Sequence, residues 1–429
     1  MLKYDAVVFD LDGTLTDSAA GIINCTRYAL EKMNKEIPCD GVLRKFLGPP
    51  LVSSFRAHCA MSEDEAKMAT QYYRERYVPI GWKENSVYPG IRSVLQGLKA
   101  QGAHLYVATA KPQDISIEIL KYFGLSQYFD AIAGALPGDT YPDKGNIIAR
   151  ALADASYENA VMIGDRGSDL LGAQKFGIDS IAAGYGYGTE DELRGVNPTH
   201  YVASVKELAE LLLGEMPASK GYFISMEGLD GCGKTTQINA VEKFLHEMGF
   251  SVRRSREPGG CPISEKIREL LLDINNTGMN DICEVLLYAA SRAQHVAQVI
   301  KPAIEQGQVV LCDRFVDSSV AFQGSGRQLG VPLIQQINAP AVNGCYPDTT
   351  VYLRLDHETA LRRRENATAL DRIENEKSSF HARVEAGFEQ LANESPERFI
   401  VVDARKTPEE LTTEIRARLL ERLIEAGVA

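Results

Sequence analysis

The chain has 429 residues, which is enough for two or three domains, and its 45% hydrophobic and 24% charged residues are ordinary for a soluble globular protein. The net charge of −12 disfavours nucleic-acid binding, although helix N-termini and local cations can still hold small anions. Because no apolar run could cross a bilayer and the start lacks a signal-peptide pattern, we expect a cytoplasmic protein with no membrane contact.

Short apolar runs alternate with helical patterns along the whole chain, which predicts an α/β fold with buried parallel strands. The expected strands are 5–10, 104–110, 160–165, 180–184, 222–228, 308–314, 350–355 and 399–404.

A break is predicted where the helical pattern around 205–216 gives way to Pro217-Ala218-Ser219-Lys220-Gly221. We therefore expect a first domain over 1–213, a linker over 214–220 and a second domain over 221–429. Residues 17–88 show a mostly helical pattern without a convincing buried strand. They are predicted to be an insertion between the first and second strands of the first domain.

Two carboxylates, Asp10 and Asp12, follow the first expected strand. Residues two apart on an extended chain point the same way, so these carboxylates repel unless a cation such as Mg²⁺ binds. The spacing also allows one to act as nucleophile and the other as general acid/base. Taken alone, the pair also fits a solvated strand end.

Four further residues follow later strands of the same half. Asp165 and Asp169 can complete the cation site, whereas Thr109 and Lys144 can bind a phosphate. All four come after strands, where open α/β sheets bind their ligands.

The ordered set D-x-D-G-T, Thr109, Lys144 and G-D-x-x-x-D resembles haloacid dehalogenase-type phosphatases over about residues 4–213. The resemblance implies a Rossmann-like core with a helical cap over about 17–88. It implies Asp10 as a nucleophile that forms an aspartyl-phosphate, and Asp12 as acid/base. It further implies that Mg²⁺ is held by Asp10, Asp165 and the Asp12 carbonyl, with support from Asp169, and that Thr109 and Lys144 bind the phosphoryl group.

The sequence does not identify the substrate of this half. A nucleoside monophosphate is the favoured class. The alternatives are a phosphoglycolate-type phosphatase, a phosphomutase, and a nucleotide-binding regulatory module without turnover.

The second half contains G-x-x-x-x-G-K-[ST] between an expected strand and a helix. In this motif backbone N–H groups wrap the phosphates of ATP, Lys234 reaches the β- and γ-phosphates, and Thr235 ligates Mg²⁺. The predicted ATP-binding residues are Gly228, Leu229, Asp230, Gly231, Cys232, Gly233, Lys234 and Thr235.

Several side chains of this half can hold an acceptor. Tyr288 and Arg292 are four apart, so on a helix they share one face and can meet a base together. Gln323 offers an amide that can read a pyrimidine. The remaining candidates are Arg256 in 256-REPGG-260 and the strand-end pair Asp313 and Arg314.

The polar stretch 361–376 is either a solvated helix or a lid that supplies a transition-state arginine, for which Arg364 and Arg372 are the candidates.

Together these motifs resemble thymidylate kinases over about residues 221–425. The resemblance implies ATP-dependent phosphorylation of dTMP to dTDP on a P-loop parallel sheet, and a homodimer formed through this half. It implies Asp230 near the deoxyribose, Tyr288 stacked on thymine, Arg292 on a thymine carbonyl, and Arg256 and Arg314 near the acceptor phosphate. The prediction is a bifunctional enzyme.

Overall fold

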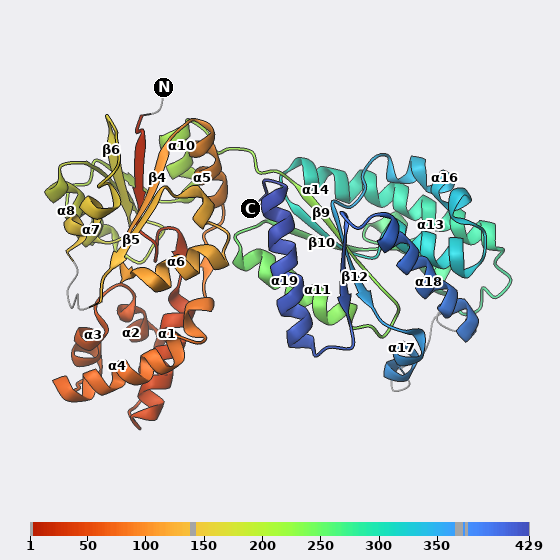
Figure 1. Ribbon diagram of the computed structural model, residues 1–429, viewed down its shortest axis with the longest axis horizontal. Coiled ribbons are helices and arrows are strands. Elements are labelled where there is room, and N and C mark those ends of the chain that lie inside the picture. The colour runs from red at the N-terminus through yellow and green to blue at the C-terminus, as the bar shows by residue number, and fades with distance from the viewer. Residues whose placement is uncertain (1–2, 138–142, 365–371, 374–375, 429) are drawn as a thin grey trace. The chain divides into compact units, whose positions relative to one another are not determined.

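The computed structural model describes residues 3–428 except 138–142, 365–371 and 374–375. The chain divides into two compact units (Figure 1). The first comprises Met1–Pro217 and Glu247–Gly249, and the second comprises Ala218–His246 and Phe250–Ala429. No described helix is long and apolar enough to cross a membrane.

The first unit is built on a parallel sheet with the strand order β5-β4-β1-β6-β7-β8 among the described residues. The central strand β1 is completely buried, because its four apolar residues are covered on both faces. The strands are β1 (Ala6–Phe9), β4 (His104–Pro112), β5 (Ala131–Ala135), β6 (Ala160–Gly164), β7 (Asp179–Ala183) and β8 (His200–Val202).

The helices of this unit follow the strands in alternation, as the sequence predicts. They are α5 (Ile91–Ala100), α6 (Gln113–Tyr122), α7 (Lys144–Ala151), α8 (Gly167–Phe176), α9 (Glu190–Gly195) and α10 (Val205–Leu213). Because α7 follows β5 and α8 follows β6 along the chain, their first residues lie at the ligand-binding edge of the sheet.

A helical cap with its own apolar core is inserted after β1 (Figure 1). Its core includes Leu30, Phe46, Phe55 and Tyr73, all at most 5% exposed. The cap elements are α1 (Ala19–Lys32), α2 (Asp40–Leu43), α3 (Leu51–Cys59) and α4 (Glu63–Tyr77). Two short antiparallel strands, β2 (Thr16–Asp17) and β3 (Ser86–Val87), pair at its base. They could not be predicted, because two residues are too few for an apolar run.

The second unit has a parallel sheet with the order β10-β11-β9-β12-β13 among the described residues. Its strands are β9 (Tyr222–Glu227), β10 (Val252–Arg256), β11 (Val309–Asp313), β12 (Thr349–Arg354) and β13 (Phe399–Asp403). Its helices are α11 (Lys234–Glu247), α12 (Pro262–Leu272), α13 (Asp281–His295), α14 (Lys301–Glu305), α15 (Val316–Ser319), α16 (Val331–Val342), α17 (His357–Arg364), α18 (Ser378–Glu394) and α19 (Pro408–Glu425). The predicted α/β class with parallel sheets is confirmed.

Two strands without a sequence prediction, β5 and β8, lie at the edges of the first sheet. β5 is only partly buried, and β8 has three residues. Edge strands are shorter and more exposed than central strands, so they lack the continuous apolar run on which the prediction of buried strands depends.

Candidate active sites

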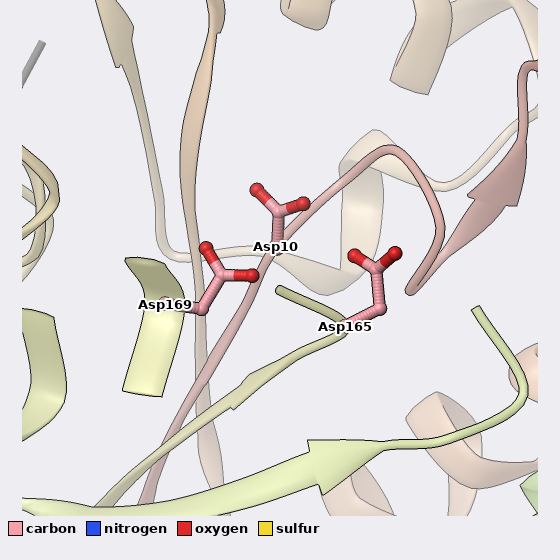
Figure 2. A group of neighbouring side chains, drawn as sticks. All are labelled: Asp10, Asp165 and Asp169. Carbon is pink, nitrogen blue, oxygen red and sulfur yellow. The ribbon is translucent and has the colours of Figure 1, made fainter. Parts of the chain in front are cut away.

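Three acidic side chains meet at the carboxyl edge of the first sheet (Figure 2). Asp10 follows β1, Asp165 follows β6, and Asp169 lies in the first turn of α8. Each offers an oxygen that lies within 4.8 Å of the others, and all three residues are buried. We call Asp10, Asp165 and Asp169 the carboxylate cluster.

Lys144, at the start of α7, is the cation of this cluster. Its Nζ lies 2.6 Å from Oδ1 of Asp10 and 2.7 Å from Oδ1 of Asp169. Burial raises the pKa of Asp10 to about 6, with Lys144 opposing the shift and Asp169 adding to it. Burial and the charge of Asp10 also raise the pKa of Asp165. One ammonium therefore does not balance three buried carboxyl groups.

The carboxylate cluster fits a divalent cation. Carboxylate oxygens are hard ligands that suit Mg²⁺, and a dication would offset the burial and the mutual repulsion that raise both pKa values. Gly13 permits the close approach of Asp165, because a Cβ at Gly13, with φ of +83°, would lie 2.1 Å from Oδ2 of Asp165. The glycine of D-x-D-G is thus required by packing against the cluster.

Asp12 and Thr109 are not members of the cluster, and both form hydrogen bonds with Lys111. The Asp12 carboxylate accepts a 2.6 Å hydrogen bond from Lys111 Nζ, and the Thr109 hydroxyl accepts one of 3.3 Å from Lys111 N. Thr109 is 2% exposed, near the end of β4. Sequence reasoning missed Lys111, because a lysine near the end of a strand has the pattern of a surface charge.

The phosphate-binding loop of the second unit, residues 228–235, connects β9 to α11. Lys234 is buried, and its Nζ donates to the carbonyls of Gly228 and Leu229 at 3.0 Å. Gly228 has φ of +143°, and a Cβ there would lie 2.8 Å from the Leu353 carbonyl. Glycine is therefore needed at this position for both conformation and space.

A cavity of ≈ 400 Å³ adjoins this loop. The lining combines residues predicted to bind ATP with residues predicted to bind the phosphate acceptor. Those that line it are Asp230, Gly231, Gly233, Lys234, Thr235, Arg256, Tyr288, Arg292, Asp313, Arg314 and Gln323. Gly228, Leu229 and Cys232 are not among the lining residues, and the thiol of Cys232 is buried behind the loop at 1% exposure.

Arg314 lies in an unusual backbone conformation for a non-glycine residue, with φ of +67°. Its Nη2 donates to Asp230 Oδ1 at 2.7 Å, and its Nη1 donates to the Ser318 hydroxyl at 3.1 Å. The next residue, Phe315, and Ser318 both donate to the buried Glu227. Glu227 thereby fixes the turn that carries Arg314.

Glu227 is a residue that sequence reasoning missed. It is fully buried at the end of β9, and burial with the nearby charge of Asp317 raises its pKa to about 8. A single acidic residue before the glycine-rich loop carries no pattern of its own, so no sequence signal distinguished it.

Tyr288 and Arg292 lie on one face of α13 and both line the cavity, as their spacing predicts. Arg292 is 1% exposed and its N–H groups are engaged within the protein. It donates to Glu257, Ser319, Asn338 and the Phe315 carbonyl. The structure thus places the guanidinium firmly in the cavity wall.

The other predicted residues of this unit have acidic partners. Arg256 pairs with Glu265 at 2.9 Å, and the Gln323 amide donates to Glu284 at 2.9 Å. Arg372 also pairs with Glu284, at 2.6 Å, and does not line the cavity. The side chain of Arg364 and the lid segment 365–371 lie outside the described residues. Asp313 has one buried oxygen without a hydrogen-bond partner among the described residues.

The second unit has the fold of a phosphate-loop kinase. The first is an α/β unit with a helical cap and a buried carboxylate cluster. The thymidylate kinase family profile matches residues 226–415, and the profile of haloacid dehalogenase-like hydrolases matches residues 7–183. The chain belongs to the thymidylate kinase family through its second unit, which is fused to a haloacid dehalogenase-type phosphatase domain.

Individual relatives match one unit each. A thymidylate kinase of Halalkalibacterium halodurans is 42% identical over 207 residues, which is 48% of this chain and 99% of that protein. One of Deinococcus radiodurans is 46% identical over 204 residues, covering 48% of this chain and 98% of that protein. The crystal structure of a predicted phosphatase of Clostridium acetobutylicum is 41% identical, covers 49% of this chain and 99% of its own, and has a TM-score of 0.46.

Proposed function

We propose that the second unit transfers the γ-phosphoryl group of ATP to dTMP and that the first unit hydrolyses a phosphomonoester through an aspartyl-phosphate. The observation that supports the kinase activity is the single cavity in which Lys234 and Thr235 of the phosphate loop meet Arg256, Tyr288 and Arg314. A phosphoryl donor and an acceptor can bind on opposite sides of it.

In the kinase unit the backbone of residues 228–235 holds the ATP phosphates, and Lys234 stabilises the charge on the β- and γ-phosphates. Arg256 and Arg314 hold the acceptor phosphate, and Asp230 lies near the deoxyribose. Tyr288 stacks on thymine, while Arg292 and Gln323 offer polar contacts to the base. Asp313 lines the same cavity. Thr235 would ligate Mg²⁺, which supplies charge neutralisation between the phosphates when bound.

An arginine of the stretch 361–376 is proposed to stabilise the transferring phosphoryl group, and Arg364 and Arg372 stay the two candidates. In this structure Arg372 is held by Glu284 and by the Leu271 carbonyl. For Arg372 to serve, it must exchange these partners for phosphate oxygens when the lid closes.

In the phosphatase unit an Asp10 oxygen attacks phosphorus as the bond to the ester oxygen breaks, and Asp12 gives that oxygen a proton. Water then attacks the aspartyl-phosphate and returns a proton to Asp12, which releases inorganic phosphate. Thr109 and Lys144 hold the phosphoryl oxygens. Asp10, Asp165 and Asp169, with the Asp12 carbonyl, would hold Mg²⁺, which supplies charge neutralisation at phosphorus when bound.

The substrate class we propose is a nucleoside monophosphate other than dTMP, since hydrolysis of dTMP would oppose the kinase. The support is the fusion to a nucleotide kinase, which is an association rather than a contact. Phosphate release should be measured with dTMP, dUMP, UMP, modified pyrimidine nucleotides, phosphoglycolate and a hexose phosphate. Release concentrated on nucleotides supports the proposal, and release from phosphoglycolate alone would overturn it.

Chelation of divalent cations is expected to abolish phosphate release and dTDP formation together. The carboxylate cluster is left with excess negative charge, which repels a phosphomonoester, and the kinase loses its Mg²⁺–ATP. Both rates should be followed during titration with EDTA and after Mg²⁺ is restored. A rate that survives full chelation would contradict the metal assignment of that unit.

We also propose that the protein is a homodimer through its kinase unit. Two large apolar side chains one turn apart on α13, Ile282 and Leu286, are 39% and 53% exposed. Burial of such a face against a second copy would stabilise a dimer by the hydrophobic effect. Sedimentation should give the dimer mass, and Leu286→Glu should shift it toward the monomer. A monomer in the unsubstituted protein would refute this assignment.

A further inference from the structure

Lys111 is a largely buried cation of the phosphatase unit that takes no part in the hydrolysis proposed above. Its side chain is 8% exposed, and its Nζ donates to Oδ2 of Asp12 at 2.6 Å. Lys111 therefore forms a largely buried ion pair with Asp12.

The two oxygens of Asp12 have different surroundings. Oδ2 is held by Lys111, whereas Oδ1 is buried and has no hydrogen-bond partner among the residues that the structure describes. A buried polar atom without a partner costs free energy, so in a native site it marks a place for a missing ligand group. Oδ1 is thus the oxygen available for proton transfer.

The backbone around Lys111 is arranged to aim this side chain. The pairing of β4 with β5 shifts register between Ala108 and Pro112, and irregularities of this kind redirect side chains near active sites. Within that stretch the Lys111 N–H donates to the hydroxyl of Thr109, the proposed phosphoryl ligand. The residue that fixes Asp12 is therefore tied to the residue that binds phosphate.

The cap also contacts Lys111. Nζ lies 5.1 Å from the ring centroid of Tyr77, the last residue of α4, within the range of a cation–π interaction. Lys111 thus lies between a core carboxylate and an aromatic ring of the cap.

We propose that Lys111 is a positioning residue of the phosphatase, which holds Asp12 by Oδ2 so that Oδ1 delivers the proton to the departing ester oxygen. This inference rests on the proposed hydrolytic function. As the phosphorus–oxygen bond breaks, the proton moves from Asp12 Oδ1 to the leaving oxygen, and the ammonium of Lys111 balances the carboxylate that results. Lys111 itself gains and loses no proton.

The test compares two leaving groups in the full-length protein with Mg²⁺. p-Nitrophenyl phosphate releases a stable phenolate that needs no proton, whereas an alkyl phosphate, taken as the best substrate of the panel, releases a basic alkoxide that does. For Lys111→Met we expect kcat/KM to fall on the order of a hundredfold for the alkyl ester and far less for the aryl ester. Lys111→Arg should restore part of the loss, and the exposed Lys121→Met is the matched control.

An equal loss for both esters would overturn the inference, because a merely structural lysine affects every substrate alike. In an Asp12→Asn background, Lys111→Met should cause no further loss for the alkyl ester, and an additive loss would count against it. If Lys111→Met fails to fold by circular dichroism, Lys111→Gln carries the same comparison. The hydrolytic function itself is tested separately, since an active Asp10→Asn variant would refute that function whatever Lys111 does.

Discussion

Replacement of Lys234 by alanine is expected to slow dTDP formation about a thousandfold, because the ammonium that stabilises charge on the β- and γ-phosphates is lost. Lys234 is 8% exposed at the start of α11 and is held by two loop carbonyls. These carbonyls hold the ammonium beside the cavity that Lys234 lines, and the ATP phosphates take their place when ATP binds.

The rate should be measured by separating dTMP from dTDP at saturating ATP. The control is Lys243→Ala, since Lys243 lies on the same helix but is exposed and outside the cavity lining. A Lys234→Ala variant that forms dTDP at a near-normal rate would refute the assignment of this loop.

Replacement of Asp10 by asparagine is expected to reduce phosphate release at least on the order of a thousandfold, because an amide cannot form the aspartyl-phosphate. Asparagine has nearly the same shape, and it removes one of three crowded carboxylates. Lys144 keeps its partner Asp169 at 2.7 Å. The variant should therefore fold, and its loss of activity should be chemical in origin.

The matched control is Asp114→Asn, an exposed aspartate of α6. Because burial raises the pKa of Asp10 to about 6, its nucleophilic form is present above that pH and is lost as the pH falls through it. The rate of the unsubstituted enzyme should fall accordingly on the acid side, and added Mg²⁺ should move this limb to lower pH. Unchanged phosphate release by Asp10→Asn would exclude Asp10 as the nucleophile.

The central strands could be predicted from sequence because burial on both faces demands a continuous apolar run, as in β1 and β6. The convergence of Asp10 with Asp165 and Asp169 followed from the same reasoning, since the carboxyl ends of neighbouring parallel strands meet at one edge. Both features can be predicted from apolar runs in the sequence and from the shared edge at which parallel strands end.

The partners of the site residues could not be predicted in this way. Glu284 accepts a hydrogen bond from Gln323 and pairs with Arg372, although both are distant in sequence. Glu257 pairs with Arg292 in the same way. Such contacts depend on tertiary packing, which leaves no trace in the spacing of residues. Lys111 was missed for a related reason, because a lysine at a strand end is usually a surface charge until burial shows otherwise.

We propose that this one chain carries two separate phosphoryl-transfer activities. The most direct test assays the unsubstituted protein, Lys234→Ala and Asp10→Asn for both dTDP formation and phosphate release from the substrate panel. We expect Lys234→Ala to lose only dTDP formation and Asp10→Asn to lose only phosphate release. Phosphate release that survives in Asp10→Asn, or one substitution that abolishes both activities, would contradict the account.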